Sequence, residues 1–256
     1  MKTLIAFVKK EITEQIRSVK LIIITAVFVF FAVMNPTVAK LTPMLYELLA
    51  DTMAQSGMTV TEVSVSAMDS WMQFFKNIPM GLIVFAILQS NIFTKEYRSG
   101  TLVLSLTKGL ERYKVVISKG TVLAVLWTIL YLLNFVVTYA CNAIFWDNSV
   151  AQNLFFAAMC WWLFGIWVIS LMIVFSAAAR SNIGALCAAG GVVFISYTVG
   201  LLPKCGKFLP TFLTDGNSLV YGVLNRNDYL PSLIITIIVS VVCFVISILI
   251  FNKKQL

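Results

Sequence analysis

Long apolar runs alternate with short polar segments along the chain. The six runs cover residues 19–39, 78–93, 115–140, 154–179, 183–202 and 233–251. About 18 apolar residues in a helix are enough to cross a bilayer, and a helix satisfies its own backbone hydrogen bonds within lipid. The pattern therefore predicts an all-α polytopic membrane protein with six transmembrane helices.

Residues 1–18 form an amphipathic segment before the first run. Ile5, Val8, Ile12 and Ile16 recur at helical spacing, and lysine and arginine occupy much of the remaining surface. This pattern predicts a helix that lies in the headgroup plane of the membrane. A signal peptide is the alternative, but no clear small-x-small cleavage site follows the apolar run.

The segments between the runs complete a single domain over residues 1–256. Residues 40–77 and 203–231 are predicted to be extracellular loops. Residues 94–112 are rich in charge and partly amphipathic, with Tyr97 and Thr101 on one face and Arg98 on the other. We therefore predict a cytoplasmic helix between the second and third spans.

Composition and charge agree with a membrane protein and give it an orientation. The hydrophobic fraction is 60% and the charged fraction 12%, against about 25% charged in soluble domains. Most of the 19 basic residues fall on the side of the N-terminus if the chain crosses six times: Lys2, Lys9, Lys10, Arg17, Lys20, Lys95, Arg98, Lys108, Arg112, Lys114, Lys119, Arg180, Lys253 and Lys254. By the positive-inside rule, both termini are expected in the cytoplasm. The basic excess therefore reflects orientation in a plasma membrane, and no nucleic-acid partner is expected.

The sequence offers no enzyme motif. It has no histidine, no GxxxxGK[ST] phosphate loop and no CxxC pair, so no metal site or catalytic residue is expected. Beyond the opening residues Lys20 and Lys119, the apolar runs carry no acidic or basic side chain, and we expect no ionisable group inside the bundle. A secondary transporter normally needs such groups, so energy is expected to come from outside the membrane.

Polar side chains inside the runs are candidates for a substrate path. They are amides and phenols without charge: Gln89, Asn91, Tyr131, Asn134 and Tyr197. The tryptophans of the fourth run, by contrast, are interpreted as interfacial anchors or lipid-facing bulk.

The charged segment between runs two and three carries a recognisable order of residues. Glu96 is followed by Gly100-Thr101, an apolar stretch, a turn over 107–112 that ends in Arg112, and Lys119 near the start of the third run. This order resembles the corresponding loop in permease subunits of the ABC-2 family of ATP-binding-cassette exporters. Many members have proline in the turn. This sequence has Thr107-Lys108-Gly109 there instead, and in this it resembles the small permeases linked to peptide-toxin or bacteriocin export or immunity.

The resemblance implies partners and roles. In such exporters the entry helix and first cytoplasmic loop pack on a separate ATPase subunit, which holds ATP and Mg, and two permeases pair to enclose a path. No cofactor is implied in this chain. The implied coupling residues are Glu96, Tyr97, Arg98, Gly100, Thr101, Arg180, Ser181 and Asn182.

Plainer interpretations of the same residues remain open. Glu96 and Arg98 are alternatively solvated charges at the headgroup level, and Arg180 is alternatively a membrane-edge anchor. The small residues of run 183–202 mark either a seam between two permeases, as in a homodimer, or packing within the chain.

The nature of the cargo follows only from the lining of the path. An uncharged lining suits amphipathic or hydrophobic peptides, such as a toxin or antimicrobial peptide, and a bacterial plasma membrane is the expected location. The alternatives are an ABC-2 exporter of small drugs or lipids, a secondary transporter outside that family, and a membrane scaffold.

Overall fold

The computed structural model describes residues 2–55, 64–92, 107, 111–179, 181–202 and 205–254, and every regular element in these ranges is helical. The α-helices are α1 (Lys2–Ile16), α2 (Val19–Gln55), α3 (Ala67–Gln89), α6 (Arg112–Phe145), α7 (Leu154–Ala178), α8 (Asn182–Gly200), α9 (Gly216–Val220) and α10 (Arg226–Lys253). Short 3-10 turns η1 (Asn148–Val150), η2 (Gly206–Phe208) and η3 (Pro210–Thr214) join them.

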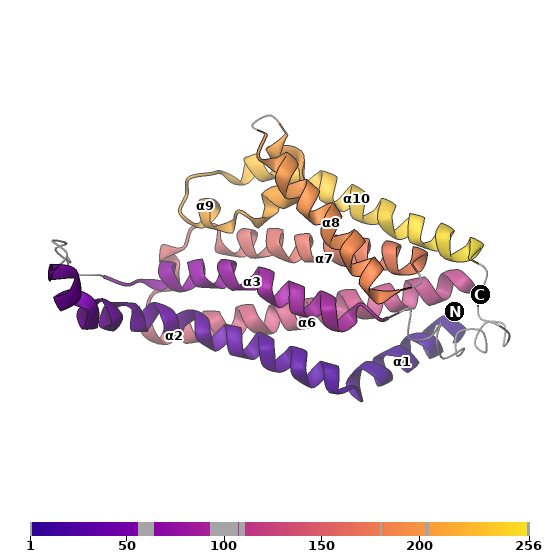
Figure 1. Cartoon of the computed structure of the whole chain (residues 1–256), viewed down its shortest axis with the longest axis horizontal. Helices are drawn as coiled ribbons and strands as arrows, with labels where there is room; N and C mark the ends of the chain where they lie inside the picture. Colours follow the sequence, from indigo (N-terminus) through magenta and orange to yellow (C-terminus); the bar gives the residue numbers. More distant parts are fainter. Residues whose placement is uncertain are drawn as a thin grey trace.

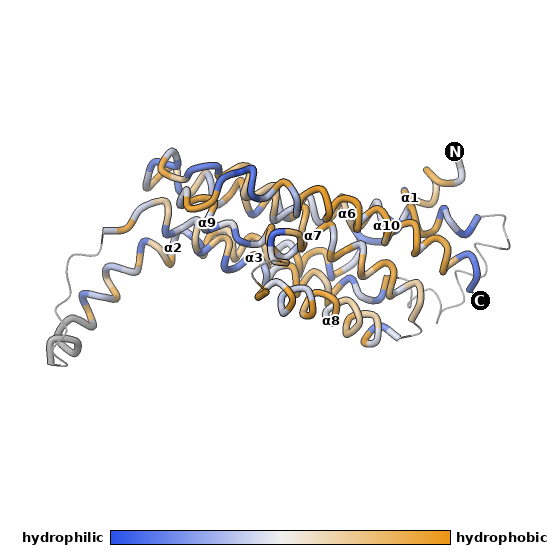
Figure 2. Tube along the Cα trace, turned by 90° about the horizontal axis from the view of Figure 1, so that it is seen from above, coloured by the Kyte–Doolittle hydropathy of each residue, from blue (hydrophilic) through white to orange (hydrophobic). Residues whose placement is uncertain are grey.

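Six of these helices are long and apolar enough to cross a membrane: α2 over Val19–Leu48, then α3, α6, α7, α8 and α10. This confirms the predicted all-helical class with six apolar helices. The long helices form an elongated bundle, and both chain termini lie at the same end (Figure 1). Hydrophobic segments dominate the middle lengths of the helices, and hydrophilic segments are more frequent toward their ends (Figure 2).

Helix α7 is the centre of the bundle. It packs against α10, α8, α6 and α3, and most of its residues are buried. Trp161 and Trp167 belong to this buried surface, so their interpretation as interfacial or lipid-facing side chains was wrong. Their spacing along an apolar helix could not show which face a neighbouring helix covers.

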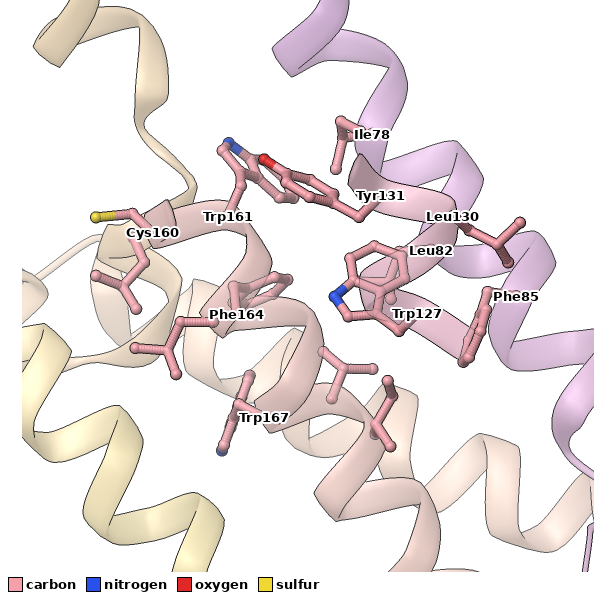
Figure 3. Packing of buried hydrophobic residues seen from close by; sticks show 14 of the residues in the cluster. Ile78, Leu82, Phe85, Trp127, Leu130, Tyr131, Cys160, Trp161, Phe164 and Trp167 are labelled. Carbon is pink, nitrogen blue, oxygen red and sulfur yellow. The ribbon is translucent and has the colours of Figure 1, made fainter. Parts of the chain in front are cut away.

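A close crossing of α6 and α7 fixes the middle of the core. Trp127 of α6 is fully buried, and its Nε1 donates to the carbonyl of Trp162 at 3.1 Å. Figure 3 shows its indole between Phe85 and the α7 segment that carries Phe164. Gly165 leaves the space for this ring, because a Cβ atom there would lie 2.3 Å from the indole carbons.

The largest difference from the predicted boundaries lies between the first two spans. Where the predicted loop 40–77 is described, it is mostly helical, since α2 continues to Gln55 and α3 begins at Ala67. Ser66 starts α3 with a capping box, in which its hydroxyl accepts from Met68 N and Asp69 accepts from Ser66 N. The predicted span 78–93 is therefore the second part of a longer helix.

Pro36 lies inside α2 without ending it. A proline cannot donate to the carbonyl four residues earlier, here that of Ala32. The hydroxyl of Thr138 on α6 donates to this carbonyl at 3.2 Å, and Asn35 donates to the same hydroxyl oxygen at 3.1 Å. One side chain of a neighbouring helix thus replaces the missing bond, which explains why the helix continues past the predicted end of span 19–39.

The predicted loop 203–231 also has internal structure at the end of the bundle away from the termini. Its described part contains η2, η3 and α9, and α10 begins within it. Tyr229 is buried and donates to the carbonyl of Asp215 at 2.7 Å. This region is therefore packed onto α7 and α10 and closes one end of the bundle.

Candidate functional site

Described residues from several segments predicted to be cytoplasmic lie at the end of the bundle that holds both termini (Figure 1). Arg112 at the start of α6 donates to the carbonyls of Asn252 and Lys254. Lys254 Nζ in turn donates to the carbonyls of Ala177 at 2.7 Å and Ala179 at 3.0 Å, which end α7. The C-terminal end thus joins the start of α6 to the turn before α8.

Two of the predicted coupling residues lie in described parts of the chain. Ser181 is the N-cap of α8, and its hydroxyl accepts from Gly184 N at 3.0 Å; Asn182 is the first residue of that helix. The others lie outside the described residues: Glu96, Tyr97, Arg98, Gly100, Thr101 and Arg180. The predicted helix over 94–112 likewise lies almost wholly outside them.

The structure describes residues at both ends of the predicted coupling segment. Ile92 follows the end of α3, and Glu111 precedes α6. Glu111 accepts from Lys114 at 2.9 Å, and this bond is the main reason that the pKa of Glu111 lies below its usual value. Both flanks of the predicted coupling segment therefore lie at the end of the bundle that holds the termini.

A buried ion pair joins the N-terminal helix to the third long helix. Lys119 Nζ on α6 lies 3.1 Å from Glu11 Oε1 and 3.0 Å from Glu11 Oε2 on α1. The side chains are only 2% and 4% exposed. The expectation that the bundle holds no ionisable group was therefore wrong at this end, because α1 covers Lys119 and Glu11 faces inward.

Sequence analysis missed this pair, although two signals were present. Glu11 follows Phe7 by four residues, and both are buried on the same face of α1. Lys119 stands among apolar neighbours, two turns into a helix that the bilayer would cover. An ionisable residue in such a place is a functional candidate by default.

Helix α1 and the start of α2 also hold the end of α3. The side-chain amides of Gln15 and Gln89 donate to each other at 3.2 Å in both directions. Lys20 Nζ donates to the carbonyl of Leu88 at 2.8 Å and to Asn91 Oδ1 at 2.6 Å. Gln89 and Asn91, both predicted for a substrate path, therefore serve as contacts between helices at this end.

A polar cavity of about 330 Å³ lies at the same junction. Its lining is charged or polar apart from one isoleucine: Glu11, Glu14, Gln15, Arg17, Ser18, Lys20, Gln89, Asn91, Ile92 and Lys119. The buried pair thus borders a polar space on one side.

The apolar stripe of α1 is not covered by the bundle. Ile5 and Ile16 are each more than half exposed, and Ile12 is 43% exposed. Phe7 and Glu11 face the bundle instead. An exposed apolar stripe beside basic residues is typical of a helix at a membrane interface.

The remaining predicted path residues do not meet. Tyr131 donates to the carbonyl of Ala158 at 2.7 Å, and Asn134 donates to the carbonyl of Phe28 at 2.8 Å, both within the core. Tyr197 on α8 donates to Thr214 Oγ1 at 3.1 Å and is partly exposed. Within this single chain the five side chains therefore do not line one channel.

Tyr197 does line a groove on the side of the bundle. This groove, about 310 Å³ in volume, lies between α3, α7 and α8, and its walls are almost entirely apolar. The lining residues are Pro79, Leu82, Ile83, Ala86, Ile87, Trp161, Phe164, Val168, Met172, Leu186, Ala189, Gly190, Val193 and Tyr197. Helix α8, which forms one wall, is mostly exposed, with only Ala185 and Ala189 buried.

The described residues hold no group of three or more metal-ligating side chains. The chemistry that they offer is instead an apolar groove, a basic end and a buried ion pair.

Comparison with protein families gives an identity to this arrangement. Residues 5–205 match the family described as ABC-2 family transporter protein. A comparison with curated proteins gave no match. The family match covers α1 to α8, well over half of the sequence, and permeases of this family generally pair with separate ATPase subunits. The chain therefore belongs to the ABC-2 family, as a non-catalytic, multi-pass membrane subunit of a transporter.

Proposed function

We propose that this permease exports its cargo with energy from a separate ATPase that docks on the basic end of the bundle. The observation that carries the proposal is the convergence at that end. Arg112 and Lys254 tie the flank of the segment 94–112 to the turn before α8. These bonds support a proposal in which a single ATPase engages both predicted cytoplasmic contacts.

The orientation follows from charge and from α1. Basic side chains gather at the end with the termini, and by the positive-inside rule this supports a cytoplasmic position for that end. The exposed stripe of α1 then lies in the inner leaflet while its lysines face water. The expected location is a bacterial plasma membrane with both termini inside the cell.

A second permease is proposed to cover the groove between α3, α7 and α8. The wall formed by α8 has open space beside Gly190 and Gly191, where an added Cβ would meet nothing within 4 Å. Small residues allow close approach of helices in a membrane. Two copies facing each other across this groove would enclose an apolar path.

The apolar lining of the groove favours amphipathic or hydrophobic peptides as cargo. Small drugs or lipids are the alternative cargo. To decide, the permease and its ATPase would be reconstituted in vesicles, and ATP hydrolysis would be measured with cationic amphipathic peptides, drugs or lipids. Stimulation by the peptides alone supports peptide export; stimulation by drugs or lipids alone contradicts it. Transport without any ATPase subunit would overturn the whole proposal.

Reversing the charge of Glu96 is expected to uncouple hydrolysis from transport. Glu96→Lys places a like charge beside Lys95 and Arg98 on the surface assigned to the ATPase, so docking should weaken. We expect unchanged membrane insertion and about a tenfold loss of transport per ATP hydrolysed, equivalent to about 1.4 kcal/mol. Wild-type coupling in this variant would remove Glu96 from the docking surface.

Filling the groove should block pairing without harming the fold. Gly190 lines the groove and has open space beside it, so Gly190→Trp should insert and fold normally. The indole would occupy the space assigned to the second permease or the cargo, and we expect transport to fall by about tenfold or more. Gly191→Trp is the matched control, because Gly191 is equally open but does not line the groove. Equal transport by both variants would contradict this role of the groove.

A further inference from the structure

We infer that Glu11 and Lys119 are positioning residues that carry movement to α1 from the segment 94–112, which is called the docking segment below because the proposed function assigns it to the ATPase. The inference rests on the proposed function and adds to it a specific pair through which the N-terminal helix takes part in coupling. Neither residue touches the cargo groove, whose lining includes no part of α1 or α6.

The geometry of the pair suits a mechanical link. Both carboxylate oxygens of Glu11 lie within 3.1 Å of Lys119 Nζ, although the residues are 108 positions apart in the sequence. Charge-assisted bonds of this kind are strong and directional. Lys10 also lies near Glu11, with its ammonium 3.3 Å from Oε1, but its side chain is 44% exposed. Lys119 is therefore the buried anchor of α1.

The position of the pair relates it to the docking segment. Helix α6 begins at Arg112, the last residue of that segment, and Lys119 follows within the same unbroken helix about 10 Å farther along. A displacement at Arg112 thus reaches Lys119 through a rigid element.

The other end of the docking segment is held by the same part of the chain. Gln15 contacts Gln89, and Lys20 contacts Leu88 and Asn91, at the end of α3. The N-terminal region therefore bridges both flanks of the docking segment. Any change in the separation of α3 and α6 must move α1 or break one of these bonds.

The polar cavity makes opening of the pair feasible. Separating two buried charges normally costs several kcal/mol, because each is left without water. Here the cavity of about 330 Å³ borders both side chains and has polar walls, so it can hold several water molecules. We therefore propose, beside the closed arrangement in the structure, a hydrated open one; together they form the two-state element that coupling requires.

The test compares four variants of the permease, each reconstituted with its ATPase. Glu11→Gln and Lys119→Met remove one charge, Glu11→Gln/Lys119→Met removes both, and Glu11→Lys/Lys119→Glu exchanges them. Lys207→Met is the matched control, because Lys207 pairs with Asp228 at 3.0 Å at an exposed site in the region between α8 and α10. The measurements are the amount of a cationic amphipathic peptide moved per ATP hydrolysed and the melting temperature of the assembled complex.

We expect the single and the doubly neutral variants to lose about tenfold in cargo moved per ATP, with hydrolysis retained. The exchanged pair should recover to within about threefold of wild type, and Lys207→Met should match wild type. The doubly neutral variant is decisive, since it keeps α1 folded against the bundle without the charges. Wild-type coupling in that variant overturns the inference, as does failure of the exchanged pair to recover in a complex that melts normally.

A second measurement decides the matter if the charge variants do not assemble. Glu11→Cys/Lys119→Cys, with the five native cysteines replaced by alanine, would be joined by a reducible bifunctional thiol reagent in the assembled complex. We expect cross-linking to stop transport and reduction to restore it. Undiminished transport by the cross-linked complex overturns the inference while leaving the proposed function intact, whereas absence of ATP-dependent transport in the wild type overturns the function itself.

Discussion

Lys119→Met is expected to lower the free energy of unfolding of the purified permease by about 3–5 kcal/mol. The substitution keeps the length and the packing of the side chain but leaves the carboxylate of Glu11 buried without its main partner. Glu11 is 4% exposed, so full hydration of its carboxylate from the neighbouring cavity requires α1 to move. The measurement is chemical unfolding in mixed micelles, followed by tryptophan fluorescence.

Two controls separate the loss of a partner from the loss of charge in general. Glu11→Gln/Lys119→Met should recover most of the stability, because neutral groups of similar shape are often tolerated where an ion pair is buried. Lys207→Met breaks an exposed pair and should change stability by about 1 kcal/mol or less. If Lys119→Met unfolds like wild type, the pair is hydrated in the native state and its burial contributes nothing.

The helical architecture could be predicted from the sequence because the bilayer strongly restricts the secondary structure of a segment that crosses it. A run such as 154–179 is long and apolar, and only a helix can cross lipid with such a run. Helix α7 covers Leu154–Ala178 accordingly. Helix ends were harder, since α2 continues to Gln55 through polar residues and two prolines. Its continuation past Pro36 depends on Thr138, a partner that local sequence patterns do not reveal.

The partners of polar side chains were the part that sequence could not supply. Amides and hydroxyls within spans were expected to line a path, yet Tyr131 and Asn134 bond to carbonyls of neighbouring helices. A polar group in a membrane helix needs a partner in either case, so its presence does not distinguish a packing contact from a path. Only the position of the neighbouring helix does so.

The partners of charged side chains were equally hard to predict from the sequence. Amphipathic spacing correctly predicts a helix near the N-terminus, with basic residues and an apolar stripe. The spacing gave no role to Glu11, whereas docking of α1 on α6 buries it against Lys119. The spacing of Phe7 and Glu11 puts both on one face of α1, but the partner is 108 positions away, so a pattern within α1 does not identify Lys119.

The contrast between the two sides of α7 has a consequence for where the molecule tolerates change. Toward α6 the helix packs against a fully buried indole, and toward α3 and α8 it borders the open groove. Gly165 of α7 faces the indole, and Gly190 of α8 lines the groove. The two glycines should therefore respond in opposite ways to the addition of one methyl group.

Gly165→Ala is expected to destabilise the protein by about 2–3 kcal/mol, the upper part of the usual range for overpacked cores. The new Cβ would lie 2.3 Å from the Trp127 indole, which is fully buried and packs with Phe85 and Tyr131 at ring centroid distances of 5.6 and 5.5 Å. The indole cannot retreat without breaking its bond to the Trp162 carbonyl. This loss exceeds the gain of about 1 kcal/mol that alanine gives a helix over glycine.

Gly190→Ala provides the opposite case in the same measurement of unfolding in mixed micelles. Its Cβ would meet nothing within 4 Å, so only the gain in helix propensity of up to about 1 kcal/mol remains, and the variant should be as stable as wild type or slightly more stable. If Gly165→Ala were equally neutral, the close approach of α6 and α7 at Trp127 would be wrong. The core would then have to accommodate the methyl group by a shift of α7, and the groove that α7 lines would change shape with it.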